Sequence, residues 1–215
     1  MNYYNPKTRI SASTIGILLG MSGFINHGIF EILQGNTPTD GLYIEAIGES
    51  HRFWIYGTEG AFTLIPNFLI TGIFVLIVSL ALVLWSIKFM QKKYGATIFL
   101  LLLILLTLVG GGIGHIVLFL PTWAYATRIN KPLNWWKKII PIKAKHVLGK
   151  LWMPLLITTA FSWLIVMELG IFGFFPGQTN PEILLNITFG FVLLTVVLAN
   201  FTFICGFARD IQERT

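Results

Sequence analysis

The sequence predicts an all-α protein, a polytopic membrane helix bundle with six transmembrane helices. Of its 215 residues, 55% are hydrophobic and only 11% are charged, whereas a soluble domain usually carries about 25% charged residues. A helical span needs about 20 apolar residues, and runs of that kind take up most of the chain. We therefore expect a single transmembrane domain over residues 1–215, with no room for a separate soluble domain.

Four spans are plain in the sequence, at about 10–35, 60–88, 149–172 and 182–207. The apolar region between residues 95 and 129 would measure about 52 Å as one helix, far more than the roughly 30 Å of a bilayer core. It is interrupted by Gly110-Gly111-Gly112 and Gly114, and clustered glycines disfavour continuous helix. We expect two spans here, 95–110 and 113–129. The alternative is a five-span chain with one long broken helix.

The placement of basic residues favours six spans. Lysine and arginine collect in cytoplasmic loops. With six spans and the N-terminus inside, every lysine and arginine except Arg52 falls on the cytoplasmic side. Five spans would put the basic segment 128–150 on the side opposite to the cluster at 88–93. We therefore expect a multi-pass protein of the cell membrane with both termini cytoplasmic, an extracytoplasmic loop at 36–59 and a basic cytoplasmic loop at 130–148.

The first span carries a stripe of small and polar residues on one helical face. Its members follow one another at intervals of four, three, four, four and three residues, which keeps them on one side of a helix: Gly16, Gly20, Gly23, His27, Glu31 and Gln34. The glycines allow another helix to approach closely. A charged group inside a bilayer costs at least about 2.5–3.5 kcal/mol, so His27 and Glu31 should face the interior of the bundle.

A second polar stripe precedes and enters the next span. Glu59, Thr63, Asn67 and Thr71 are spaced by four, and we expect them to share one face of a helix kinked at Pro66. Antiparallel pairing would then set His27 and Glu31 against Thr63 and Asn67. This predicts a ligand-binding pocket open to the outside, with the 36–59 loop as its lid, formed by His27, Glu31, Gln34, Glu59, Thr63 and Asn67. The structural alternative is that His27 and Glu31 bond each other and a neighbouring helix, and so lock the bundle.

Specific catalytic or metal-binding roles have less support in the sequence. His27 and Glu31 are the catalytic candidates, because a paired imidazole and carboxyl could act as general base and acid. His27 and Glu31 with His115, or with Glu59, are weak candidates for a metal site; we expect neither a metal nor another cofactor. The sequence has no His-Glu-x-x-His, no Gly-x-Ser-x-Gly and no phosphate-binding glycine loop.

The inner loop and the last two spans suggest partners. Trp135-Trp136-Lys137-Lys138, followed by Lys143 and Lys145, is typical of a segment that rests on anionic lipid headgroups. The net charge of +6 reflects placement relative to the membrane, and we expect no nucleic acid. Spans 149–172 and 182–207 could form a face for a membrane protein partner.

About the first 130 residues contain a set of short motifs: His27-Gly28-x-x-Glu31-x-x-Gln34-Gly35-Asn36, Asp40-Gly41, Glu59-x-Ala61-x-Thr63, Pro66-Asn67, Gly110-Gly111-Gly112 and Ala126-Thr127-Arg128. This set resembles a family of uncharacterised small bacterial multispanning membrane proteins. It departs from the family pattern at His115, where prolines are usual. No activity is assigned to that family, so the resemblance implies only that the outer stripe and loop are the shared feature.

Three functions compete at this point. The first is a membrane protein that binds or transports a small polar or amphiphilic ligand. The second is an intramembrane enzyme that uses His27 and Glu31 on a lipid or isoprenoid substrate. The third is a non-catalytic subunit or assembly factor of a larger membrane complex. A cavity that reaches His27 and Glu31 from the outside would favour the first.

Overall fold

A computed structural model describes residues 3–214 and shows an all-α helical bundle with one small hairpin. The first helix is continuous from Pro6 to Leu33, with a π-helical middle. Its parts are α1 (Pro6–Ser22), η1 (Gly23–Ile29) and α2 (Phe30–Leu33). The remaining helices are α3 (Phe68–Lys88), α4 (Gly95–Leu108), α5 (Ile116–Ala126), α6 (Asn134–Ile139), α7 (Ile142–Phe172) and α8 (Pro181–Gln212). Two short strands, β1 (Tyr43–Glu45) and β2 (Gly60–Phe62), and a 3₁₀ turn, η2 (Glu49–His51), lie in the loop after α2.

Four of these helices are long and apolar enough to cross a membrane: Pro6–Leu33, α3, α7 and α8. The helices α4 and α5, with 14 and 11 residues, are apolar but shorter than the roughly 17 residues that a span needs. Helix length alone therefore supports four crossings.

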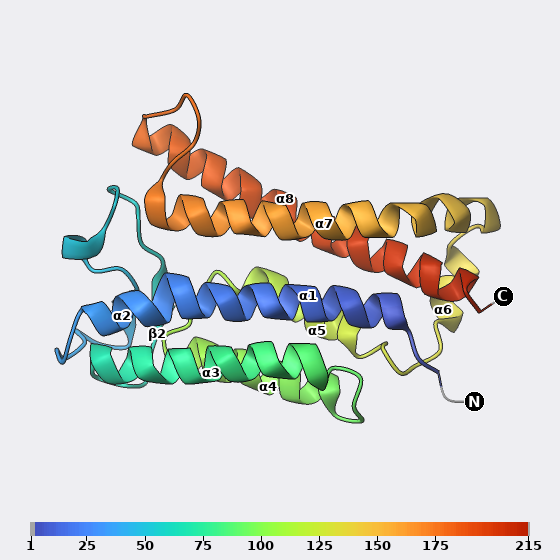
Figure 1. Ribbon diagram of the computed structural model, residues 1–215, viewed down its shortest axis with the longest axis horizontal. Helices are drawn as coiled ribbons and strands as arrows, with labels where there is room; N and C mark the ends of the chain where they lie inside the picture. Colours follow the sequence, from blue (N-terminus) through green and yellow to red (C-terminus); the bar gives the residue numbers. More distant parts are fainter. Residues whose placement is uncertain (1–2, 215) are drawn as a thin grey trace.

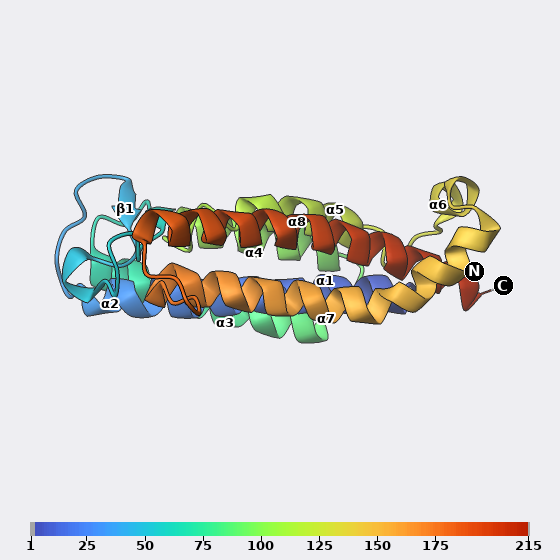
Figure 2. The ribbon, with the colours of Figure 1, turned by 90° about the horizontal axis from the view of Figure 1, so that it is seen from above.

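The first helix lies in the middle of the bundle, as Figure 1 shows, with α7 and α8 on one side and α3 and α4 on the other. Both chain ends lie at the same end of the bundle, and α6 lies there too (Figures 1 and 2). The opposite end carries α2, the strands and the loop after α2. Close packing against α3 uses the predicted glycine face: a Cβ at Gly20 would lie 3.0 Å from the Ser79 carbonyl oxygen, and one at Gly23 would lie 2.7 Å from Ser79 Oγ.

The second span was expected over 60–88, but its helix begins only at Phe68. Pro66 is the physical reason, because a proline pushes the residue before it towards extended backbone. Asn67 then caps the helix, and its Oδ1 accepts a hydrogen bond of 3.1 Å from the Ile70 backbone N–H. Glu59 and Thr63 therefore lie outside the helix, and the expected helical face with Asn67 and a kink at Pro66 does not exist.

The loop between α2 and α3 descends into the bundle and meets the turn between α4 and α5. β1 and β2 pair antiparallel, with Tyr43 opposite Phe62. Leu64, just past β2, donates its N–H to the Leu108 carbonyl (3.0 Å). At the start of β2, the Gly60 carbonyl accepts from Ile113 N–H (3.2 Å). Irregular backbone at membrane depth is tolerated where protein buries it and satisfies its polar groups. The hairpin segment thus pairs backbone groups of the turn between α4 and α5.

At the end of the bundle that carries the termini, a residue of α8 caps the N-terminus of the first helix. Asp210 is buried, and its carboxylate accepts hydrogen bonds from the backbone N–H groups of Lys7 (2.9 Å) and Thr8 (3.0 Å) and from the Thr8 hydroxyl (2.7 Å). Asn5, the residue before the helix, makes no side-chain cap of its own. The first turn of α1 is therefore capped by a residue from a different helix.

The basic loop expected at 130–148 is partly helical. It contains α6, and α7 begins at Ile142 rather than near residue 149. Trp136 packs on Phe207 of α8, with ring centroids 4.8 Å apart, while Trp135 is exposed. This arrangement leaves the lysines of the loop outside the bundle; their contact with anionic lipid stays a prediction.

Candidate functional site

The π-helical stretch of the first helix carries the candidate site. Segments of π-helix are rare and often occur at functional positions, and this one holds Asn26 and His27. His27 is fully buried, and its Nε2 lies 3.1 Å from Oε2 of Glu59. The sequence pattern placed both residues in the site, but it did not pair them, because it set Glu59 on a helix that in fact begins nine residues later, at Phe68.

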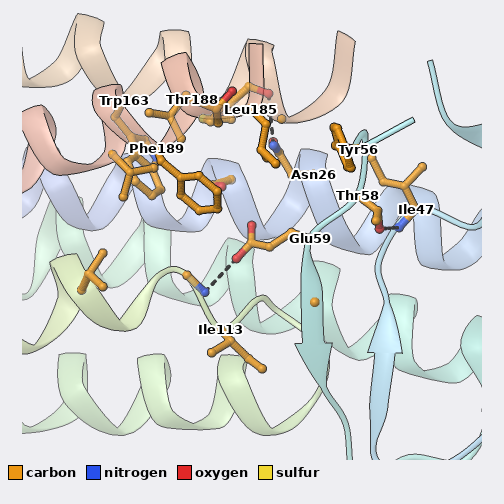
Figure 3. Close-up of a pocket in the computed structure, with 18 of the residues that line it drawn as sticks. Asn26, Ile47, Tyr56, Thr58, Glu59, Ile113, Trp163, Leu185, Thr188 and Phe189 are labelled. Carbon is orange, nitrogen blue, oxygen red and sulfur yellow. Dashed lines mark hydrogen bonds between the residues drawn. The ribbon is translucent and has the colours of Figure 1, made fainter. Parts of the chain in front are cut away.

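The glycine cluster after α4 is shaped around this pair. Gly114 N–H donates to Oε1 of Glu59 (2.8 Å), the dashed contact beside Glu59 in Figure 3. Gly112 has φ +91°, and a Cβ there would lie 2.5 Å from His27 Nε2 and 3.0 Å from Glu59 Oε1. Only glycine fits such a backbone position without strain. The cluster therefore forms part of the site, in addition to making the turn.

Glu59 is held in its ionised form. Removal from water alone would raise the pKa of its carboxyl group, but attraction to His27 and His115 and hydrogen bonds from His27 and Gly114 outweigh that effect. Together they lower the pKa of Glu59 from 4.5 to about 2. Its side chain is 38% exposed, so the charge remains open to a ligand from one side.

This lowered pKa predicts an acid-side loss of stability. A carboxyl group with a depressed pKa in the folded protein contributes stability that is present above about pH 4.5 and is lost as the pH falls towards about 2. We expect the thermal midpoint of the wild-type protein in mild detergent to drop more across this range than that of Glu59→Gln. Glu49→Gln, which changes an exposed glutamate of the same loop, should follow the wild type. Parallel curves for all three would contradict the assignment.

His115 lies next to His27 but does not complete a metal site. Its Nε2 is 2.9 Å from Ser22 Oγ, and the two imidazole rings meet edge to face with centroids 5.5 Å apart. Among residues 3–214, no three histidine, cysteine, aspartate or glutamate side chains converge as metal ligands. The weak metal candidates His27, Glu31 and His115 therefore gain no support from the geometry.

Glu31 is fully buried one turn from His27. Neither of its carboxyl oxygens has a hydrogen-bond partner within residues 3–214, and a Cβ at Gly110 would lie 2.8 Å from its Oε1. The expected facing partners Thr63 and Asn67 bond elsewhere. An unpaired buried carboxyl group is stable only when it is neutral, so Glu31 should be in its acid form.

A neutral Glu31 predicts that the neutral isostere is tolerated. We expect Glu31→Gln to change the free energy of unfolding by less than about 1 kcal/mol, since size and charge state are preserved. Denaturant unfolding followed by circular dichroism would measure this. A loss above about 3 kcal/mol would show that Glu31 is ionised and paired, because breaking a buried charge pair has that effect.

Three other predicted ligand residues hold the outer loop in place. Gln34 Nε2 donates to the Ala46 carbonyl (3.0 Å), and Asn67 Nδ2 donates to Asn36 Oδ1 (2.8 Å). The hydroxyl groups of Thr63 and Thr71 are 3.2 Å apart. None of Gln34, Thr63 and Asn67 lines the cavity that lies beside Glu59. Their observed contacts attach the outer loop to the bundle.

A cavity of about 560 Å³ lies beside Glu59, between the first helix, the outer loop and the α7–α8 pair. Its polar lining includes Ser22, Asn26, Tyr43, Thr58, Glu59 and Thr188, and its apolar lining includes Val117, Val166, Leu185, Phe189 and Val192. Figure 3 shows Glu59 at the centre, with Thr188, Leu185 and Phe189 across from it. His27 and Glu31 lie behind Glu59 and do not line the cavity.

Sequence reasoning missed the α7–α8 side of this site. Trp163, Leu185 and Phe189 read as ordinary membrane-span residues, and no polar pattern marks them. Asn26 could have been found, because it is a polar residue directly before His27 within an apolar run.

The fold and the site define a helical bundle with membrane-length helices and a mostly apolar cavity that contains one glutamate, Glu59. No protein family, curated protein or solved structure matches the chain. The resemblance to an uncharacterised bacterial membrane family therefore stays a prediction.

Proposed function

We propose that the protein crosses the cell membrane six times with both termini in the cytoplasm. The hairpin segment forms backbone hydrogen bonds with Leu108 and Ile113. It thereby extends the structure formed by the short helices α4 and α5, so that each of these two helices can serve as a span. Both termini and α6 lie at one end of the bundle, as an even number of crossings requires. The basic residues of α6 and its neighbours lie at that end, which favours a cytoplasmic orientation. The cavity then lies towards the extracytoplasmic side.

We further propose that the protein binds an amphiphilic molecule in the cavity. The observation that carries this proposal is the composition of the lining, in which a few polar groups, Glu59 and Asn26 among them, stand among mostly apolar side chains from α5, α7 and α8. Ligand sites are mostly apolar clefts with a few polar groups that fix orientation. A molecule with one polar end and one apolar tail matches this lining.

The surroundings of the cavity support entry from the side. Phe189 and Val117 line the cavity and are 63% and 45% exposed. In a membrane these side chains would face lipid, because apolar helix surfaces are covered by acyl chains. A tail could therefore pass between α5 and α8 without crossing water, while the polar end reaches Glu59.

A pair of glycine variants tests occupancy of the cavity. Gly170 lines it, and a Cβ there would meet only Asn26 Nδ2, at 3.6 Å, so Gly170→Leu would fill space in the cavity. Gly190 on α8 has open space around it and does not line the cavity, which makes Gly190→Leu the matched control. The probe is a dodecyl maltoside that carries a photoreactive diazirine in its tail, added to the protein in lipid nanodiscs.

We expect labelled peptides to include Val166, Leu185 or Phe189, and Gly170→Leu to remove this labelling while Gly190→Leu retains it. Labelling spread evenly over the lipid-facing helices in all three proteins would overturn the proposal. Mass spectrometry of the digested protein gives the positions directly.

Acid–base catalysis within the membrane is a second candidate. The observation in its favour is the 3.1 Å contact between His27 and Glu59, with Glu59 lining the cavity; this geometry replaces the expected pair His27 and Glu31. If the pair is catalytic, nanodiscs made from native lipid extract should change composition over time with the wild-type protein and stay unchanged with His27→Gln. Identical lipid profiles would leave binding alone as the function.

A further inference from the structure

We propose that the polar end of the ligand is an amine with at least one N–H group, so that the cavity takes amphiphilic ammonium compounds. This inference rests on the proposed binding function and names the chemical class of its ligand. Three features of the cavity carry it: an unpaired acceptor, a partly exposed carboxylate with no lysine or arginine among the described lining residues, and aromatic rings.

The unpaired acceptor is the side-chain oxygen of Asn26. Asn26 is only 8% exposed and lines the cavity, and its Nδ2 donates to the Met167 carbonyl at 3.2 Å. Its Oδ1 has no hydrogen-bond partner within residues 3–214. The amide cannot be turned round, because its oxygen would then face the Met167 carbonyl oxygen. A buried acceptor that lacks a hydrogen bond costs free energy. A ligand that donates an N–H to Asn26 Oδ1 would therefore be favoured.

The charge in the cavity has one sign. Glu59 is the only aspartate, glutamate, lysine or arginine among the described residues that line it. Arg52, a basic residue of the same loop, bonds Glu45 instead. His27 Nε2 contacts Oε2 of Glu59 and the Gly114 N–H contacts Oε1, but the side chain is 38% exposed and each carboxylate oxygen can accept a further hydrogen bond. An ammonium group could donate to this carboxylate, whereas a sulfate or phosphate head would meet repulsion.

Aromatic rings also line the cavity. Tyr43, Trp54 and Tyr56 from the outer loop and Trp163 from α7 all line it. The Tyr43 phenol lies over Gly60, directly after Glu59, and Trp54 and Tyr56 meet edge to face at 5.7 Å. Aromatic faces attract cations, and cages of such rings are used to recognise ammonium ligands.

Competition against the photoreactive dodecyl maltoside tests the head group with the tail held constant. The competitors are dodecylamine, dodecyltrimethylammonium, dodecyl sulfate and unlabelled dodecyl maltoside, each added to the protein in nanodiscs of zwitterionic lipid. We expect dodecylamine to displace the cavity label at about tenfold lower concentration than dodecyl maltoside or dodecyl sulfate. Dodecyltrimethylammonium has the charge but no N–H. The concentration at which it displaces the label should lie between that of dodecylamine and that of dodecyl maltoside.

Two neutralised glutamates provide the matched variants. Glu59→Gln should reduce the advantage of dodecylamine to about twofold or less, and Glu49→Gln, which removes the same charge outside the cavity, should keep it. Equal competition by all four heads in the wild-type protein would overturn the ammonium assignment and leave amphiphile binding in place. Absence of cavity labelling by the probe itself would instead overturn the proposed function.

Discussion

Replacing Asp210 with alanine is expected to lower the free energy of unfolding by about 2–4 kcal/mol. The change removes the cap of the first helix and leaves the N–H groups of Lys7 and Thr8, as well as the Thr8 hydroxyl, without their acceptor. Loss of a cap costs about 0.5–2 kcal/mol, and the buried Thr8 donors left without an acceptor add about 1–3 kcal/mol in total. Denaturant unfolding in mild detergent, followed by circular dichroism, would measure the loss.

Glu213 offers the control for this experiment. It pairs with Lys7 (3.2 Å) and Arg209 (2.8 Å) only a few residues along the chain, but the contacts are exposed. Exposed ion pairs contribute about 0–1 kcal/mol, so Glu213→Ala should remain within about 1 kcal/mol of the wild type. Equal losses for Asp210→Ala and Glu213→Ala would show that general charge at this end matters, and that the specific cap does not.

Replacing Gly112 with alanine is expected to cost about 2–4 kcal/mol and to abolish labelling of the cavity. A Cβ at this position would collide with His27 and Glu59, and the backbone φ of +91° is strained for any residue with a side chain. The His27–Glu59 contact and the hydrogen bond from Gly114 could not both survive. Thermal unfolding and photolabelling of the same preparation would record the two effects together.

Gly177→Ala separates the two causes. Gly177 has a similar φ of +78°, but no atom lies within 4 Å of the Cβ that would be added. This variant should show only the cost of the left-handed backbone, about 1–2 kcal/mol, with cavity labelling unchanged. If Gly112→Ala behaves in the same way, the glycine cluster serves only as a turn and the site does not depend on it.

The sequence predicts the helical class and much of the burial in this protein, because both follow from apolar length and from the cost of exposing charge to lipid. His27 and Glu31 are fully buried, as their place in the first stripe indicates. The second stripe failed because a spacing of four places residues on one face only within a helix, and residues 59–67 are not helical. Pro66 was visible in the sequence, and its stronger effect is to delay the helix rather than to kink it.

The cavity itself could not be predicted, because it depends on how separate helices pack. Leu185, Phe189 and Val192 differ in no sequence property from the residues that face lipid on α8. The pairing of His27 with Glu59 depends on the hairpin and on the turn at 112–114, which approach each other from distant parts of the chain. Sequence spacing gives no information on such contacts.

The cap supplied by Asp210 also has a consequence for the order of folding. Its hydrogen bonds to Lys7 and Thr8 join residues more than 200 positions apart, so the contact carries the high loop-closure entropy of a non-local interaction. During synthesis the first helix must wait, with its leading N–H groups unsatisfied, until α8 has been made. Final closure of the bundle is therefore a late step, and an intermediate that lacks α8 should be exposed to proteolysis at its N-terminal turn.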